Sequence, residues 1–81
     1  MTLTNLNEQP ASQDYLKAIF RITEGKGPQT RANTKAIAAE LGVSQPSVSA
    51  MLDRLAAAKL VDYVHYGGAQ LTEDGRHAAL R

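Results

Sequence analysis

The chain concentrates small polar side chains in one short stretch, which reads SQPSVSA and spans Ser44–Ala50. Hydroxyl and amide groups can hydrogen-bond to phosphate oxygens or base edges, and the free N–H groups at a helix start favour phosphate. Ala50 and the Pro46 ring also suit contact with thymine methyl groups. The predicted nucleic-acid contacts are Ser44, Gln45, Pro46, Ser47, Ser49 and Ala50. The alternative is ordinary helix-start chemistry with solvated side chains.

Basic side chains surround this stretch in the sequence. The segment Gly25–Val61 holds five basic and two acidic residues, a local net charge of +3, whereas the whole chain carries +1. A local excess of positive charge attracts polyanions. The basic residues predicted to contact phosphate are Arg31, Lys35 and Arg54. Each is equally consistent with a plain solvated charge.

A helix-turn-helix pattern positions these side chains. Thr34 is expected to cap a helix that runs to Leu41, and Gly42 stands where a left-handed residue ends a helix. Ser44 is expected to cap the next helix, with Pro46 in its first turn, where a missing N–H has no consequence. The inner face of that helix is predicted to be Val48, Met51, Leu52, Leu55 and Leu60. In a helix-turn-helix, the first residues of the second helix meet base edges in the major groove.

An arm and one helix precede this pattern. Residues 1–11 are polar and lack a hydrophobic period, so we expect a mobile arm. Ser12 is expected to cap the first helix, whose apolar residues recur at helical spacing from Tyr15 onward. Two glycines and a proline within residues 24–28 end that helix.

In the last third of the chain, alternation of inward and outward side chains replaces the helical spacing of apolar residues. The segment LVDYVHY, residues 60–66, alternates as a strand does, and the stretch AQLT returns as a second strand. Gly67 and Gly68 are expected to form a two-residue hairpin turn. Thr72 is expected to cap a last short helix. The predicted fold is mainly α with a small β-hairpin, a winged helix-turn-helix that fills residues 12–81.

Composition argues against several classes of protein. The 81 residues suit one small domain, and the absence of cysteine leaves neither disulfides nor thiolate metal ligands. No apolar run reaches the ~18 residues of a membrane helix, and no signal-peptide pattern begins the chain, so we expect a cytoplasmic protein. No Ser/His/Asp grouping, Gly-rich phosphate loop or carboxylate pair marks an enzyme.

Three motifs together resemble a known family. They are DYLKAIF in the first helix, IAAELGVSQPSVS across the turn and LVDYVHYGGAQLTEDG through the hairpin. They resemble the N-terminal DNA-binding domain of the diphtheria-toxin-repressor and manganese-transport-regulator family, bacterial iron- or manganese-dependent transcriptional repressors. The resemblance implies a dimer that sets two recognition helices in a palindromic operator. It adds Thr34 to the predicted DNA contacts beside Lys35, and the chain lacks the Arg that relatives often carry near Gly67.

The resemblance also implies a metal site at the start of the first helix. Manganese regulators bind the ion there through an Asp and a Glu three residues later; the matching positions are Asp14 and Lys17, and an ammonium is no ligand. Asp14 can supply an oxygen ligand to Mn²⁺ or Fe²⁺. The alternative is a carboxylate favoured by the helix dipole. His77 does not match the family's ligand histidine, and the remaining ligands and the dimerisation helices of relatives lie beyond Arg81.

These differences set expectations for the chain as it stands. Transition metals normally take three or four ligands, so we expect no tightly bound metal here and a weak dimer or a monomer. A full-length parent with the C-terminal metal-binding and dimerisation domain is expected to bind Mn²⁺ or Fe²⁺ and to form a homodimer. Two rival functions stay open: a winged-helix protein-interaction module, and a winged-helix regulator of another family that metal does not control.

Overall fold

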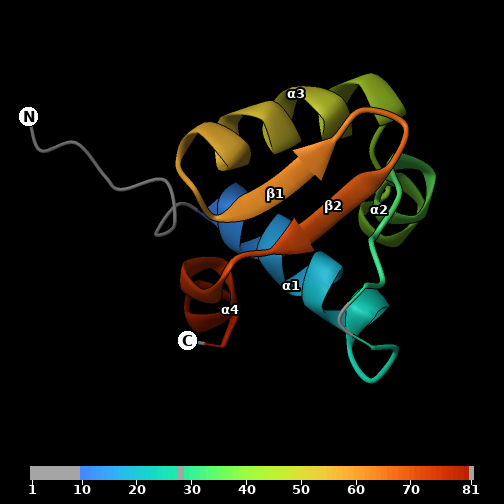
Figure 1. Ribbon diagram of the computed structural model, residues 1–81. Helices are drawn as coiled ribbons and strands as arrows, with labels where there is room; N and C mark the ends of the chain where they lie inside the picture. Colours follow the sequence, from blue (N-terminus) through green and yellow to red (C-terminus); the bar gives the residue numbers. More distant parts are fainter. Residues whose placement is uncertain (1–9, 28, 81) are drawn as a thin grey trace, which may run out of the picture.

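Four helices and one β-hairpin make up the fold (Figure 1). The computed structural model describes residues 10–27 and 29–80. The elements are α1 (Pro10–Thr23), α2 (Thr34–Leu41), α3 (Gln45–Ala57), β1 (Val61–Val64), β2 (Gly68–Leu71) and α4 (Glu73–Ala79). This order confirms the predicted winged helix-turn-helix. No helix in the described part of the chain is long and apolar enough to cross a membrane.

The first helix begins earlier than the sequence predicts. α1 starts at Pro10, so Pro10 and Ala11 belong to the helix and not to the predicted arm. Proline suits a first helical turn because its missing N–H would have no helical partner there. Ser12, predicted as the cap, lies inside the helix and is fully buried. The rest of the predicted arm, residues 1–9, lies outside the described residues.

The caps of the helix-turn-helix agree with the sequence at two of three positions. Asn33, and not Thr34, caps α2, because its side chain accepts the N–H of Ala36 at 2.7 Å. Asn is the stronger capping residue of the two, and it leaves Thr34 as the first residue of the helix. Gly42 ends α2 in the predicted left-handed conformation (φ 68°), and Ser44 caps α3 as predicted.

The hairpin loop is one residue longer than predicted. β1 pairs with β2 in antiparallel register, so that Val64 lies opposite Gly68 within the ladder. This register leaves three residues in the loop, His65–Gly67, instead of the two-residue turn expected at Gly67–Gly68. Tyr66, and not a glycine, takes the left-handed conformation in the loop (φ 64°).

A short extended segment ahead of α2 lies along the free edge of β2. Ala32 donates to and accepts from the backbone of Ala69, at 2.8 Å in each direction. The hairpin is therefore joined by hydrogen bonds to the chain that enters the helix-turn-helix.

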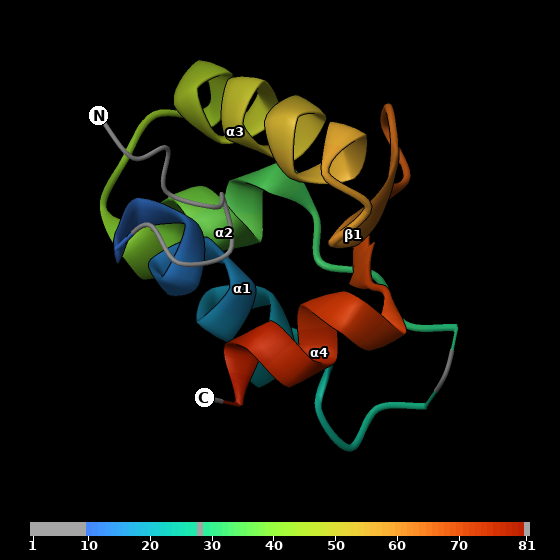
Figure 2. The ribbon, with the colours of Figure 1, turned by 90° about the vertical axis from the view of Figure 1, so that its left-hand side faces the viewer.

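α1 lies at the centre of the packing. It contacts α2, α4 and β2, and Figure 2 shows α1 and α2 between α3 on one side and α4 on the other. The fully buried large aliphatic side chains come from three helices: Leu16, Ile19, Ile37, Val48, Leu52 and Leu55. The predicted inner face of α3 is confirmed for Val48, Leu52 and Leu55, with Met51 only partly buried, whereas Leu60 is buried but lies beyond the end of α3 at Ala57. Burial of each such side chain contributes about 1.5–3 kcal/mol to folding.

The helix starts and the hairpin loop face one side of the molecule. In Figure 1 the first turns of α2 and α3 and the β1–β2 loop lie toward the right, whereas α4 lies toward the left. A partner that approaches this side of the molecule would meet the two helix starts and the hairpin loop together.

Candidate DNA interface

Two serines organise the first turn of α3. Ser44 Oγ accepts the N–H of Ser47 at 3.2 Å and donates its own hydrogen to Ser47 Oγ at 2.9 Å. Both residues are exposed. A bond between two hydroxyls uses one of their two hydrogens, so the pair keeps one hydroxyl hydrogen for a phosphate oxygen or a base edge.

The outer face of α3 carries most of the predicted contacts. Val48, Leu52 and Leu55 turn inward and are fully buried. Helical geometry therefore turns the opposite side chains outward. The predicted contacts that are exposed here are Ser44, Gln45, Pro46, Ser47, Ala50 and Arg54. Ser49 is half-buried at the edge of this surface.

The start of α2 joins the same surface. Thr34 Oγ1 lies 3.4 Å from Gln45 Oε1, a long hydrogen bond between the first residues of the two helices. The bond occupies the carbonyl end of the Gln45 amide and leaves its NH₂ end as a donor. Lys35 follows Thr34 and is exposed. The structure thus brings Thr34 and Lys35 next to the start of α3.

The three basic residues that the sequence predicts as phosphate contacts differ in their availability in the structure. Arg31 is engaged within the protein, because its Nη2 lies 2.8 Å from Asp62 Oδ2. Lys35 and Arg54 are exposed, and neither forms an ion pair with another residue that the structure describes. Lys35 and Arg54 therefore keep their charge available to phosphate, whereas Arg31 is bound to the hairpin.

The hairpin presents aromatic groups in place of positive charge. Tyr66 is fully exposed, and its ring stands edge-on to that of His65, with 5.9 Å between centroids. The His65 ring lies 5.3 Å from that of Tyr63. The sequence from Val61 to Leu71 contains no Lys or Arg. This hairpin therefore has neither residue to offer to phosphate.

Asp14, the predicted metal ligand, lies on the outer side of α1. It is exposed, as is Lys17 one turn further along. Across residues 10–27 and 29–80, no group of three or more His, Cys, Asp and Glu side chains is placed to hold a metal ion. Because transition metals normally take three or four ligands, these residues alone do not fit one.

Two roles at this surface were missed in the sequence. Asn33 precedes the helical pattern of α2, and its strength as a cap is a local signal that could have identified it. The attachment of Arg31 to Asp62 has no such signal, because the two residues lie 31 positions apart.

Comparison with known proteins gives a consistent result. The sequence profile of a family described as "iron dependent repressor, N-terminal DNA binding domain" matches residues 9–69. A protein named HTH-type transcriptional regulator MntR, from Oceanobacillus iheyensis, is 36% identical over 72 residues, which is 89% of this chain and 47% of that protein.

Two further relatives carry a similar name. They are called transcriptional regulator MntR, from Escherichia coli O6:H1 and O157:H7, and each is 36% identical over 66 residues. Each match covers 82% of this chain and 41% of the relative. The chain thus spans less than half the length of the curated relatives it matches.

Proposed function

The chain belongs to the iron-dependent repressor family and carries its N-terminal DNA-binding domain, and on that premise we propose that it reads a palindromic operator in double-stranded DNA for a metal-dependent transcriptional repressor. The first turn of α3 enters the major groove, where Ser44, Gln45 and Ser47 meet phosphates and base edges. The observation that supports this role is the exposed polar turn above a fully buried apolar face.

Positive charge near this turn supports the same role. Lys35 and Arg54 contact phosphates on either side of α3 and fix its register on the duplex. Pro46 and Ala50 add an apolar surface suited to thymine methyl groups. The positive dipole ends of α2 and α3, with the uncapped N–H groups of Thr34, Lys35 and Gln45, also favour phosphate.

The full-length protein is proposed to act as a homodimer in the cytoplasm. Two protomers related by two-fold symmetry match the two halves of a palindrome. Mn²⁺ or Fe²⁺ controls that parent protein, and Asp14 contributes one oxygen ligand together with ligands outside this chain.

The positions of the exposed apolar side chains favour DNA over a protein as the partner of α3. The large apolar side chains that are exposed in the described part of the chain are Val43, Val64, Tyr66 and Leu80, and none lies on α3. A helix that docks on a protein presents apolar anchors at helical spacing. The outer face of α3 presents hydroxyls and alanines instead.

The test is binding of this chain to DNA duplexes enriched from a randomised library, measured by fluorescence anisotropy over a range of salt concentrations. We expect saturable, sequence-preferring binding that weakens as salt rises, because Lys35 and Arg54 displace counterions. Addition of Mn²⁺ is expected to leave this affinity unchanged. Absence of binding at low salt, or binding without sequence preference, would contradict the proposal.

Two matched variants locate the contact on α3. Ala50 and Ala57 are both exposed and lie two turns apart on one face of the helix. Ala50→Glu is expected to weaken binding by at least about tenfold, because a carboxylate then faces phosphates and bases. Ala57→Glu carries the same charge and is expected to weaken binding by less than about threefold. Equal losses would mean that net charge, and not the first turn, governs binding.

A further inference from the structure

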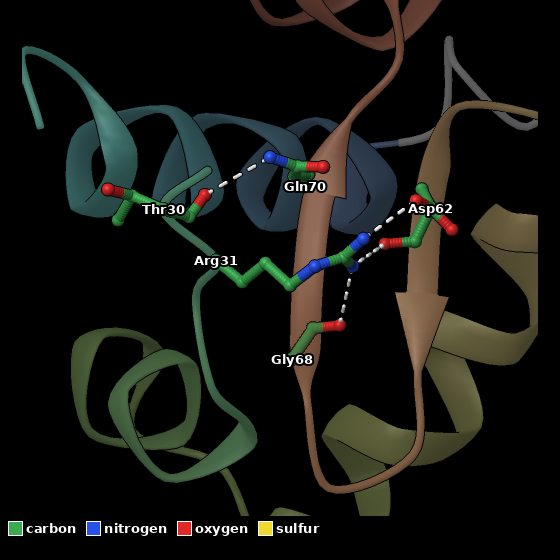
Figure 3. Close-up of polar contacts among 5 residues, drawn as sticks. All are labelled: Thr30, Arg31, Asp62, Gly68 and Gln70. Atoms are coloured by element: carbon green, nitrogen blue, oxygen red, sulfur yellow. Dashed lines mark hydrogen bonds and ion pairs between the residues drawn. The ribbon is translucent and has the colours of Figure 1, made fainter. Parts of the chain in front are cut away.

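Arg31 connects the chain ahead of α2 to both strands of the hairpin (Figure 3). Its Nη1 donates to the backbone oxygens of Asp62 and Gly68, at 3.0 Å and 3.3 Å. Its Nη2 donates to Asp62 Oδ2 at 2.8 Å. One planar guanidinium thus holds three acceptors that come from β1 and β2. A lysine ammonium lacks this fork geometry.

The next residue continues the attachment. Ala32 pairs with Ala69 through two backbone hydrogen bonds of 2.8 Å. The approach is so close that a Cβ on Gly68 would lie 2.6 Å from the oxygen of Ala32. The hairpin and the residue before Asn33 therefore pack without space for a side chain between them.

The two residues that follow form the start of α2, and one of them contacts the start of α3. Asn33 caps α2 by accepting the N–H of Ala36 at 2.7 Å. Thr34 reaches Gln45 at the first residue of α3. Four consecutive residues, 31–34, thus hold the hairpin, start α2 and contact the start of α3.

We propose that Arg31 is a positioning residue for DNA recognition, which fixes the hairpin relative to the first turns of α2 and α3 through residues 31–34. The inference rests on the proposed DNA-binding function. Loss of the guanidinium fork frees the hairpin to move against the helix starts, and the two no longer meet a duplex in one fixed arrangement. The role is indirect, because the fork of Arg31 faces Asp62 and Gly68 and not the outer surface of α3.

A direct phosphate contact by Arg31 predicts different results from a positioning role. If Arg31 bound phosphate, Asp62→Ala would release it and remove a negative charge, so DNA binding would tighten. If Arg31 positions the hairpin, Asp62→Ala removes one of its acceptors and weakens binding. Arg31→Lys separates the two roles again, because lysine keeps the charge and loses the fork.

The experiment measures DNA affinity and its salt dependence for the native chain, Arg31→Lys, Arg31→Ala and Asp62→Ala. The duplex is the one enriched by the native chain. We expect affinity losses of about threefold to tenfold, as for residues that couple elements without touching the ligand. The slope of log affinity against log salt is expected to stay native in Arg31→Lys and Arg31→Ala, whereas loss of one phosphate contact lowers it by about one.

Arg21→Ala is the matched control. Arg21 Nε lies 3.0 Å from Glu40 Oε2, so this variant also loses one arginine and one surface ion pair, between α1 and α2. It is expected to change affinity by less than about twofold, since exposed pairs contribute little. Amide hydrogen exchange of the DNA-free protein adds a second readout. The N–H groups of Ala32 and Ala69 are expected to exchange about tenfold faster in Arg31→Lys and at the native rate in Arg21→Ala.

The outcomes distinguish this inference from the proposed function. Failure of the native chain to bind DNA would overturn the proposed function and this inference with it. Tighter binding by Asp62→Ala, native affinity in Arg31→Lys, or Arg31 variants that behave like Arg21→Ala would overturn this inference alone.

Discussion

Ser12 is a buried residue whose hydroxyl group forms no hydrogen bond with the part of the chain that the structure describes. It is fully buried within α1, and its Oγ has no hydrogen-bond partner among the described residues. A buried hydroxyl without a partner costs stability, and alanine has the higher helix propensity. We expect Ser12→Ala to raise the free energy of unfolding by about 1–2 kcal/mol, measured by urea denaturation.

Ser44→Ala is the control for that measurement. It makes the same chemical change at a cap whose Oγ accepts the N–H of Ser47, so it is expected to lower stability by about 1 kcal/mol. A loss of stability in Ser12→Ala as well would show that the Ser12 hydroxyl has a partner in solution.

Residue roles could be predicted from the sequence where they depend on neighbours in the chain. Ser44 and Gly42 have their predicted roles because cap chemistry involves residues within one turn. The sequence predicts Arg31 equally as a phosphate contact or a solvated charge, but its acceptors lie 31 and 37 positions away. No local pattern records such a pairing, so only the fold could show what Arg31 holds.

At the scale of elements, the position of α4 depends on a close approach between the backbone at Gly75 and the backbone at Leu60. A Cβ built on Gly75 would lie 1.9 Å from the oxygen of Leu60, just ahead of β1. We expect Gly75→Ala to lower stability by more than about 3 kcal/mol, because backbone, and not a flexible side chain, must move. Thermal unfolding followed by circular dichroism measures the change.

Gly42→Ala separates crowding from backbone strain. Gly42 has φ 68°, and a Cβ there meets no atom within 4 Å. Its replacement is expected to lower stability by only about 1 kcal/mol, the strain of a left-handed alanine. Similar losses at Gly42 and Gly75 would mean that the contact with Leu60 is relieved at little cost.

Hydrophobic periodicity and cap residues together predicted each helix and strand of the described chain, and the errors fall at the boundaries. The sequence suggested a glycine turn at Gly67–Gly68, but Gly68 is needed in β2, where Ala32 leaves no room for a side chain. Gly68 keeps a positive φ (87°) inside the strand, and the non-glycine residues with positive φ in the described chain are Tyr66 in the loop and Lys59 after α3. Glycine-based reasoning could not find either position, because the chain there places other residues in a strained conformation.

For the molecule as a whole, α1 joins the parts into one core. Tyr15 and Leu16 belong to the same buried cluster as Ile37 of α2 and Leu52 of α3. A domain of this size with a single core is expected to unfold in one transition. Ionisation of one core group should therefore destabilise the whole domain and not one helix.

Tyr15 is the core group that can ionise at high pH. Burial raises the pKa of the Tyr15 phenol above its ordinary value of 10.0. As pH rises, the unfolded chain therefore loses this proton before the folded chain does. The stability that the protonated Tyr15 phenol contributes is complete below its pKa in the unfolded chain. It is lost as pH rises through its pKa in the folded chain. Tyr15→Phe is expected to remove this contribution to the loss of folding stability at high pH.

Urea unfolding at a series of pH values from about 8 to 11 tests the effect, since this window spans the ordinary tyrosine pKa. The free energy of unfolding of the native chain should fall more steeply above about pH 10 than that of Tyr15→Phe. Tyr66→Phe makes the same change on a fully exposed ring and is expected to follow the native curve. Parallel curves for the native chain and Tyr15→Phe would show that Tyr15 does not couple ionisation to the core.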